Sequence, residues 1–451
     1  MKFSNKTNIQ SVISMTIIGI LFFIFGFVTW LNGSLIPFLQ IICELDEFEA
    51  LLVTFSFYIA YTVMAYPMSM ILSRSGYKNG MAIGLLIMSV GALLHIPAAL
   101  SGIYSLFLLA LFVLATGLTI LQTASNPYLV YLGPEKSAAM RISIMGIVNK
   151  GAGVVVPIIF TALILSDIGD ISKSYVMSLS DEQFLIYKET LSQKLIMPYT
   201  IMAGVLFVLI GLLKFAPLPE IQPTSDPSGS IATAEKKSSI LNYPQAVLGA
   251  FALFAYVGVE VIAGDTIGLY GASLDVPNFS GLTSYTMFFM VIGYVLGIIC
   301  IPRFISQQKA LTLSAVAGSA CIVGIITASP DSVSLSQLLW GWTGIPVLPN
   351  PVTWVALMGL AHALVWPSVW PLALKDLGQH SAQGSALLIM GISGGAILPL
   401  VFGKISSATG DLQLAYLVGL PCYLFILFYA LRGHKIRRWP WSASTSSMGK
   451  R

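Results

Sequence analysis

Residues 132–147 read LGPEKSAAMRISIMGI, and residues 377–392 read LGQHSAQGSALLIMGI. In both stretches a Leu-Gly pair precedes a Met-Gly-Ile triplet, and the methionine follows the glycine by twelve residues. Pro127 and Pro371 stand shortly before the two copies. A single matching tripeptide is common by chance, but agreement in order and interval is not. The chain is therefore predicted to consist of two related halves.

The composition predicts a protein that lies in a membrane. Of the 451 residues, 56% are hydrophobic and only 9% are charged, and the mean hydropathy is +0.85. A soluble domain carries about 25% charged residues. The net charge is +4, but the basic residues form no cluster of the kind that binds nucleic acid. Lipid is therefore the expected surrounding, and no nucleic-acid partner is expected.

Twelve segments are long and apolar enough to cross a bilayer as helices, which takes about 20 residues each. The fold class predicted is an all-α membrane protein with twelve transmembrane helices in two six-helix halves. The first half has spans near 12–40, 50–72, 79–99, 103–130, 142–166 and 196–216. The second half has spans near 243–271, 283–302, 309–328, 352–374, 383–404 and 412–432. The first span follows Lys2 and Lys6 and shows no A-x-A cleavage pattern, so it is predicted to stay uncleaved.

The Lys and Arg residues predict the orientation, because loops on the cytoplasmic side carry an excess of them. Most fall on the side of the two termini, and the first loop on the other side is acidic. Both termini are therefore expected in the cytoplasm. The predicted division is a half at 1–216, a Pro- and Ser-rich cytoplasmic linker at 217–242, a half at 243–432 and a basic tail at 433–451.

The four cysteines predict neither a disulfide framework nor a metal site. Cys43, Cys300, Cys321 and Cys422 are far apart and show no CxxC spacing or cluster with histidine. No cofactor is expected.

Three ionisable residues lie deep inside predicted spans: Lys150, Glu260 and Asp265. A charge at mid-bilayer costs at least about 2.5–3.5 kcal/mol and persists only where it faces a polar interior. Gly258 and Gly264 flank Glu260 and predict a break in the seventh helix. One interpretation is a site for a coupling ion or for sugar hydroxyls. The other is a buried pair of Lys150 with an acid that only holds the halves together.

Neutral polar and aromatic side chains at similar depth form a second set of candidates. The amides and the histidine are Asn32, Gln122, Asn126, Asn149 and His362, and the aromatic residues are Trp30, Tyr58, Tyr61, Trp366 and Trp370. Amides suit the hydroxyls of a polyol, and aromatic faces suit a sugar ring. Each aromatic residue is as readily an interface anchor, and His362 is as readily a packed helix histidine.

At these residues the chain resembles the fucose permease and glucose–galactose transporter branch of the major facilitator superfamily. The resemblance covers nearly all of the chain. It rests on TWLNGSLIPFL, LQTASNPYLVYLGPE, RISIMGIVNKGAGV, EVIAGDTIG, SYTMFFMVIGYVLGIICIPRFISQ, LVWPSVWPLAL and GSALLIMGISGGA. Within that branch, LNG, LQTA-x-NPY and NKGAG are most similar to bacterial N-acetylglucosamine permeases.

The resemblance implies a major facilitator fold and secondary uptake of N-acetylglucosamine across the bacterial inner membrane by a monomer. Proton symport with alternating access is implied as the mechanism, and a glucose or galactose transporter is the alternative. Sugar binding carries over to Asn149, which matches the family's asparagine, and to Gln122. The remaining candidates are Asn32, Asn126, Tyr58 and Trp366 for the sugar, and Lys150, Glu260, Asp265 and His362 for coupling.

Two positions depart from the fucose branch, which has acids where Gly33 and Gln122 stand here. These acids are thought to serve proton coupling there, so that mechanism is not inherited. Glu260 is the acid predicted to load and release the proton, with Asp265 as its rival. We also predict that N-acetylglucosamine competes better than fucose or galactose.

Other classes of protein have less support from the sequence. A membrane-embedded enzyme needs an acid–base or metal constellation, and the four histidines are scattered. ATP-driven transport needs a GxxxxGK[ST] segment, which the chain lacks. A sugar receptor derived from a transporter stays as an alternative.

Overall fold

The computed structural model describes residues 2–131, 138–165, 173–216, 240–301, 304–377 and 381–439. All regular elements in these ranges are helices. In the first half they are α1 (Lys2–Ile42), α2 (Glu47–Ala50), α3 (Leu52–Ser101), α4 (Tyr104–Tyr131), α5 (Ala138–Leu165), α6 (Lys173–Ser178), α7 (Asp181–Lys194) and α8 (Ile196–Phe215).

The helices of the second half are more often interrupted. They are α9 (Pro244–Asp265), α10 (Ile267–Ser273), α11 (Thr283–Cys300), α12 (Gln307–Thr327), α13 (Ser334–Trp340), α14 (Asn350–His362), α15 (Val365–Leu374), α16 (Ser381–Met390), α17 (Gly394–Thr409), α18 (Leu412–Ala415) and α19 (Gly419–Leu431). Short 3₁₀ turns are η2 (Ile240–Asn242), η3 (Phe279–Gly281), η5 (Gly391–Ser393), η6 (Tyr416–Val418) and η7 (Gly433–Lys435). The predicted seventh, tenth, eleventh and twelfth spans are thus each built from two helices.

The fold class predicted from the sequence is confirmed. Eleven described helices are long and apolar enough to cross a membrane, and α5 holds a further, shorter apolar stretch at Ile144–Phe160. Together they occupy the twelve predicted spans. The predicted second and third spans are the two parts of α3, which a non-helical kink at Gly76 separates, where φ is +76°. Only glycine adopts such a backbone at little cost.

The sixth span differs from its predicted form, and the seventh span breaks. The helix of the sixth span is preceded by the polar helix α7, so that the combined element runs over Asp181–Phe215. Ser180 is the N-cap of α7 and forms a capping box with Gln183, which stabilises the start of this helix. The seventh span breaks at Thr266, directly after Asp265. A break was predicted in this helix from its glycines.

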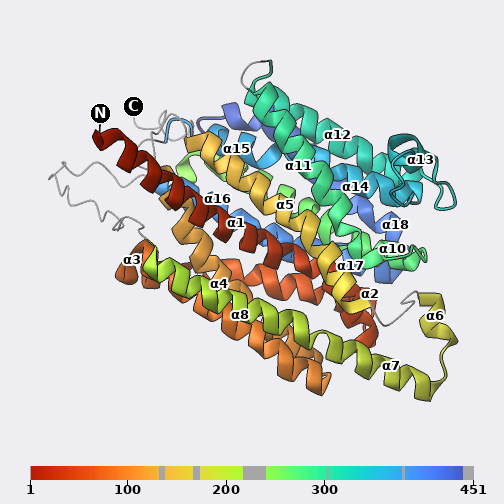
Figure 1. Cartoon of the computed structure of the whole chain (residues 1–451). Coiled ribbons are helices and arrows are strands. Elements are labelled where there is room, and N and C mark those ends of the chain that lie inside the picture. Colours follow the sequence, from red (N-terminus) through yellow and green to blue (C-terminus); the bar gives the residue numbers. More distant parts are fainter. Residues whose placement is uncertain are drawn as a thin grey trace, which may run out of the picture.

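The helices form two groups that meet along α1, α5 and α3. Figure 1 shows α3, α4 and α8 along the lower edge and α11, α12 and α14 along the upper edge, with α1 and α5 between them. Across the boundary α5 packs against α11, α1 against α9 and α10, and α3 against α17. The predicted linker and tail fall mostly on residues 217–239 and 440–451, which lie outside the described residues, so the domain limits stay a prediction.

The end of the molecule opposite Lys2 is called here the far end. The short helices α2, α6, α10, α13 and α18 gather there (Figure 1). Hydrogen bonds join the halves near this end, because Ser34 Oγ donates to the Ser280 carbonyl at 2.7 Å and the Ser406 hydroxyl donates to Glu47. Gly403 packs against the backbone of Phe48. The two halves are therefore in direct contact at the far end.

Candidate functional site

An ion pair joins the two halves in the middle of the molecule. Lys150 Nζ of α5 lies 2.6 Å from Glu260 Oε1 of α9, and only 12% and 8% of the two side chains are exposed. Nζ also lies 4.3 Å from the ring centroid of Trp30 on α1, as a cation–π contact. The sequence predicted both charges at depth, and the structure brings them together.

Glycines from both halves hold Trp30 in place beside this pair. A Cβ atom on Gly153 of α5 would lie 2.7 Å from Trp30 Cδ1, and one on Gly264 of α9 would lie 2.5 Å from Cζ3. The indole is 1% exposed, and its Nε1 has no hydrogen-bond partner in the described part of the chain. Trp30 was a candidate for stacking on a sugar ring. In this arrangement its faces are covered by the protein.

Tyrosines surround Glu260. The phenols of Tyr58, Tyr256 and Tyr294 all interact electrostatically with its carboxylate. Tyr58 is stacked on Tyr61, with 6.2 Å between ring centroids. Tyr256 lies one turn before Glu260 on α9, so helical spacing places the two on one face. The sequence analysis missed Tyr256 and Tyr294. The i, i+4 spacing to Glu260 is a signal that could have identified Tyr256.

In each of the two predicted sugar-binding amides, the NH2 group donates a hydrogen bond to another residue of the protein. Asn149 Nδ2 donates to the Phe22 carbonyl at 3.3 Å, and Gln122 Nε2 donates to Tyr61 Oη at 3.0 Å. Both side chains are partly exposed, and their amide oxygens accept no hydrogen bond from the described residues. These oxygens are therefore suited to accept hydrogen bonds from sugar hydroxyls.

Other predicted residues lie apart from this amide pair. Asn32 is 2% exposed and its Nδ2 has no partner within the described ranges. The side chain of Asn126 lies outside the described residues. Trp366 is partly exposed, with its ring 6.3 Å from Tyr256 and 5.6 Å from Trp370. The ring of Tyr256 thus contacts Trp366 and also interacts with Glu260.

His362 is packed inside the second half. It is fully buried, its Nε2 lies 2.6 Å from Tyr423 Oη of α19, and its ring is stacked on that tyrosine. It also meets Tyr256 edge-on at 6.1 Å. These contacts fit the interpretation of a packed helix histidine better than that of a proton carrier open to solvent.

Asp265 does not share the Lys150 pair. It is fully buried at the end of α9, and its Oδ2 accepts a hydrogen bond from Thr54 Oγ1 of α3 at 3.0 Å. Its Oδ1 has no partner among the described residues. No feature of the sequence pointed to Thr54, because a threonine in a transmembrane helix usually bonds its own backbone.

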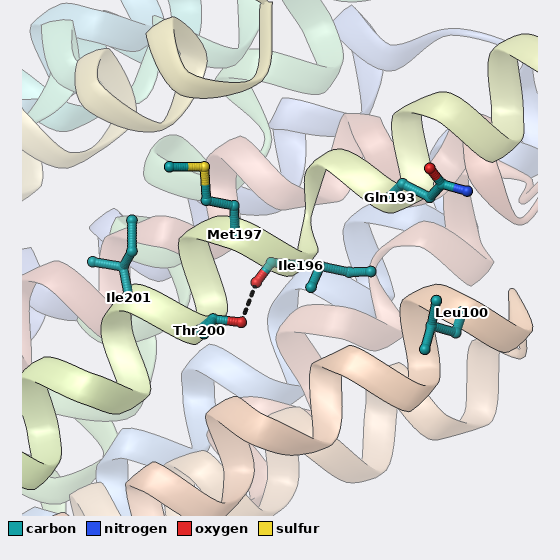
Figure 2. A pocket seen from close by; sticks show the side chains of 6 residues that line it. All are labelled: Leu100, Gln193, Ile196, Met197, Thr200 and Ile201. Atoms are coloured by element: carbon teal, nitrogen blue, oxygen red, sulfur yellow. Dashed lines mark hydrogen bonds between the residues drawn. The ribbon is translucent and has the colours of Figure 1, made fainter.

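A shallow pocket on the surface of the first half is separate from this cluster. Figure 2 shows it between the end of α3 at Leu100 and the α7–α8 junction at Gln193, Ile196, Met197, Thr200 and Ile201. The Thr200 hydroxyl is bonded to the Ile196 carbonyl. The pocket is mostly apolar and touches only one half, so it is not where a substrate between the halves would bind.

The chain matches the family model of the Major Facilitator Superfamily over residues 18–399. It is 32% identical to the glucose/galactose transporter of Brucella abortus, over 94% of each chain. It is 29% identical to the L-fucose-proton symporter of Escherichia coli, over 93% of this chain and 92% of that one.

Among solved structures, the crystal structure of the transporter FucP in the outward conformation matches with a TM-score of 0.68 and 26% identity, over 93% of this chain and 98% of that one. A D-xylose-proton symporter matches with a TM-score of 0.65 at 13% identity, over 94% and 99% of the two chains, which supports the fold alone. These proteins are transporters and not enzymes. The family model covers most of the chain, and the chain therefore belongs to the Major Facilitator Superfamily.

Proposed function

We propose that this protein is a secondary transporter that takes up a hexose sugar across a bacterial inner membrane. The observation that carries the proposal is the buried cluster between the halves, where the Lys150–Glu260 pair lies beside the amides Asn149 and Gln122 and several tyrosines. A polar cluster at the interface of two helical halves is where transporters of this architecture bind substrate. The names of the relatives support a sugar as that substrate.

Two substrate assignments have separate support. Glucose and galactose are named for the Brucella abortus relative and have the stronger support from the comparisons. N-acetylglucosamine rests on the motif resemblance described above. Both proposals agree that L-fucose fits poorly, because the neutral Gln122 offers no charge-assisted hydrogen bond and Gly33 offers no side chain.

Competition for uptake tests this proposal. In proteoliposomes that take up radiolabelled glucose or N-acetylglucosamine, an excess of the unlabelled hexoses should inhibit and L-fucose should inhibit least. Stronger inhibition by glucose than by N-acetylglucosamine would support the glucose/galactose assignment. The reverse order would support N-acetylglucosamine. L-fucose as the strongest competitor would contradict both assignments.

The amide of Asn149 is expected to bind the sugar directly. Asn149→Ala should weaken binding to the purified protein about two- to tenfold, because one neutral hydrogen bond contributes about 0.5–1.5 kcal/mol. Asn79→Ala is the matched control, since Asn79 Nδ2 bonds a backbone carbonyl on α3 in an exposed position. Wild-type sugar affinity in a folded Asn149→Ala protein would leave Asn149 a packing role only.

Protons are the proposed coupling ion, and both termini are proposed to lie in the cytoplasm. The L-fucose-proton symporter relative supports the first proposal, and the distribution of Lys and Arg supports the second. Uptake of the identified sugar, measured with and without an imposed pH gradient, tests the coupling. The sequence favoured Glu260 as the proton carrier, but in this structure Glu260 already has Lys150 as a cationic partner.

A further inference from the structure

Asp265 is a buried acid that has no counter-charge among the described residues. Its side chain is fully buried, Oδ2 accepts one hydrogen bond from the neutral Thr54, and Oδ1 has no partner in the described part of the chain. An ionised carboxylate in such a place costs several kcal/mol unless a cation or several donors satisfy it. The observed surroundings therefore suit the neutral, protonated acid.

The groups that face Asp265 from the neighbouring elements strengthen this conclusion. Glu260 of α9 and Tyr58 of α3 interact with it electrostatically, and neither supplies a positive charge. Tyr416 is bonded to the adjacent Thr266. The ammonium of Lys150 on α5 already contacts Glu260 and Trp30. Ionisation of Asp265 with the halves in this arrangement would thus place a second negative charge beside Glu260.

Asp265 is buried by the contact between the halves. Its partner Thr54 belongs to the first half, and a Cβ on Gly33 of α1 would lie 3.2 Å from the Asp265 Cα. The same added Cβ would lie 2.6 Å from the Gly264 carbonyl oxygen. Next to this contact, Ser34 donates to the Ser280 carbonyl. Separation of the halves at the far end would remove Thr54 and α1 from Asp265 and admit water to its carboxyl group.

We propose that Asp265 carries the coupling proton and that its protonation favours closing of the far end. The inference rests on the proposed function. With the far end open, the carboxylate takes one proton from the solution on that side. Closing buries the neutral acid as seen here. When the transporter opens toward the other side, the acid releases that proton there, and the carboxylate left without a counter-charge then favours reopening of the far end. One proton thus crosses with the sugar in each cycle. By linkage, the protonation of Asp265 shifts the equilibrium between the open and the closed far end, and this equilibrium shifts the protonation in turn.

Transport by Asp265→Asn separates coupling from sugar movement. Asparagine has the shape of the neutral acid and cannot release a proton, so exchange of labelled for unlabelled sugar across proteoliposomes should continue within about threefold of the wild-type rate. Accumulation driven by an imposed proton gradient should fall at least about tenfold. Proton-driven accumulation at the wild-type level would overturn the proposal, as would loss of exchange in a folded protein. Failure of the wild-type protein itself to exchange sugar would instead contradict the proposed function.

A second measurement follows the far end directly and needs no sugar. Ser280→Cys places a thiol at a fully buried position of the far-end contact, in a protein from which the four native cysteines have been removed. Its rate of alkylation by a maleimide in detergent reports opening. The alkylation rate is measured in Ser280→Cys and in Ser280→Cys/Asp265→Asn at each pH. Dividing the first rate by the second removes the effect of pH on the ionisation of the thiol, which is common to both proteins.

This ratio should rise by up to about tenfold per pH unit between about pH 5 and about pH 8, because opening releases one proton. Asp331→Asn, which removes an exposed acid between α12 and α13, is the matched control and should leave the pH dependence unchanged. A ratio that stays constant with pH would show that the far end closes without a proton on Asp265.

Discussion

Glu260→Gln is expected to destabilise the protein by about 3–5 kcal/mol and to abolish proton-driven accumulation, because it leaves the Lys150 ammonium buried without its counter-ion. Lys150→Met should destabilise it comparably by stranding the Glu260 carboxylate. The double variant Lys150→Met/Glu260→Gln removes both charges and should recover most of the loss. Thermal unfolding of the purified proteins measures all three.

The exposed pair Lys188–Glu44 provides the control for this cycle. Its side chains are 27% and 62% exposed, so that Lys188→Gln should change the stability by at most about 1 kcal/mol. If Asp265 is the proton carrier, the double variant should also regain proton-driven accumulation. A stable double variant that still exchanges sugar but does not accumulate it would return the coupling role to Glu260, as the sequence predicted.

Gly33→Ala is expected to slow sugar exchange by about five- to hundredfold, because an added methyl group prevents the halves from closing at the far end. Its Cβ would lie 2.5 Å from Thr283 Oγ1 and 2.6 Å from the Gly264 carbonyl. The threonine side chain can rotate away, but the backbone carbonyl cannot move without shifting α9. Overpacking of this kind costs about 1–3 kcal/mol, and here only the closed state bears the cost.

The initial rate of sugar exchange in proteoliposomes measures this effect. Gly204→Ala in α8 is the matched control, since no atom lies within 4 Å of its added Cβ, and it should exchange sugar at the wild-type rate. Maleimide alkylation at Ser280→Cys should be faster in Gly33→Ala than in its parent. Unchanged exchange and unchanged alkylation would show that the contact at Gly33 does not limit closing.

The charged residues of the candidate site were predictable from the sequence, but which of the two acids pairs with Lys150 was not. Burial of an ionisable group in a bilayer is costly enough that Lys150, Glu260 and Asp265 stood out against a chain with only 9% charged residues. The sequence left two acids as possible partners of Lys150. The structure selects Glu260, and it gives Asp265 a neutral partner in Thr54, 211 positions away in the chain.

Roles that depend on exposure also needed the structure. Trp30 and His362 each have the chemistry expected of a sugar or proton site, yet Trp30 is enclosed by glycines of both halves and His362 is bonded to Tyr423. By contrast, Asn149 and Gln122 keep an amide oxygen without a partner among the described residues. The side-chain type alone does not distinguish these cases, because it says nothing of what covers the group.

The sequence by itself determined the twelve spans, the two halves and the identity of the buried charges. Each of these follows from a local requirement, since a segment in lipid must be apolar over about 20 residues and must satisfy its own backbone hydrogen bonds. The tertiary structure decided which charges pair, which acid has no counter-charge among the described residues and where the halves touch. These depend on contacts such as Gly33 with Gly264 and Thr54 with Asp265, whose partners are brought together only by the packing of one half against the other.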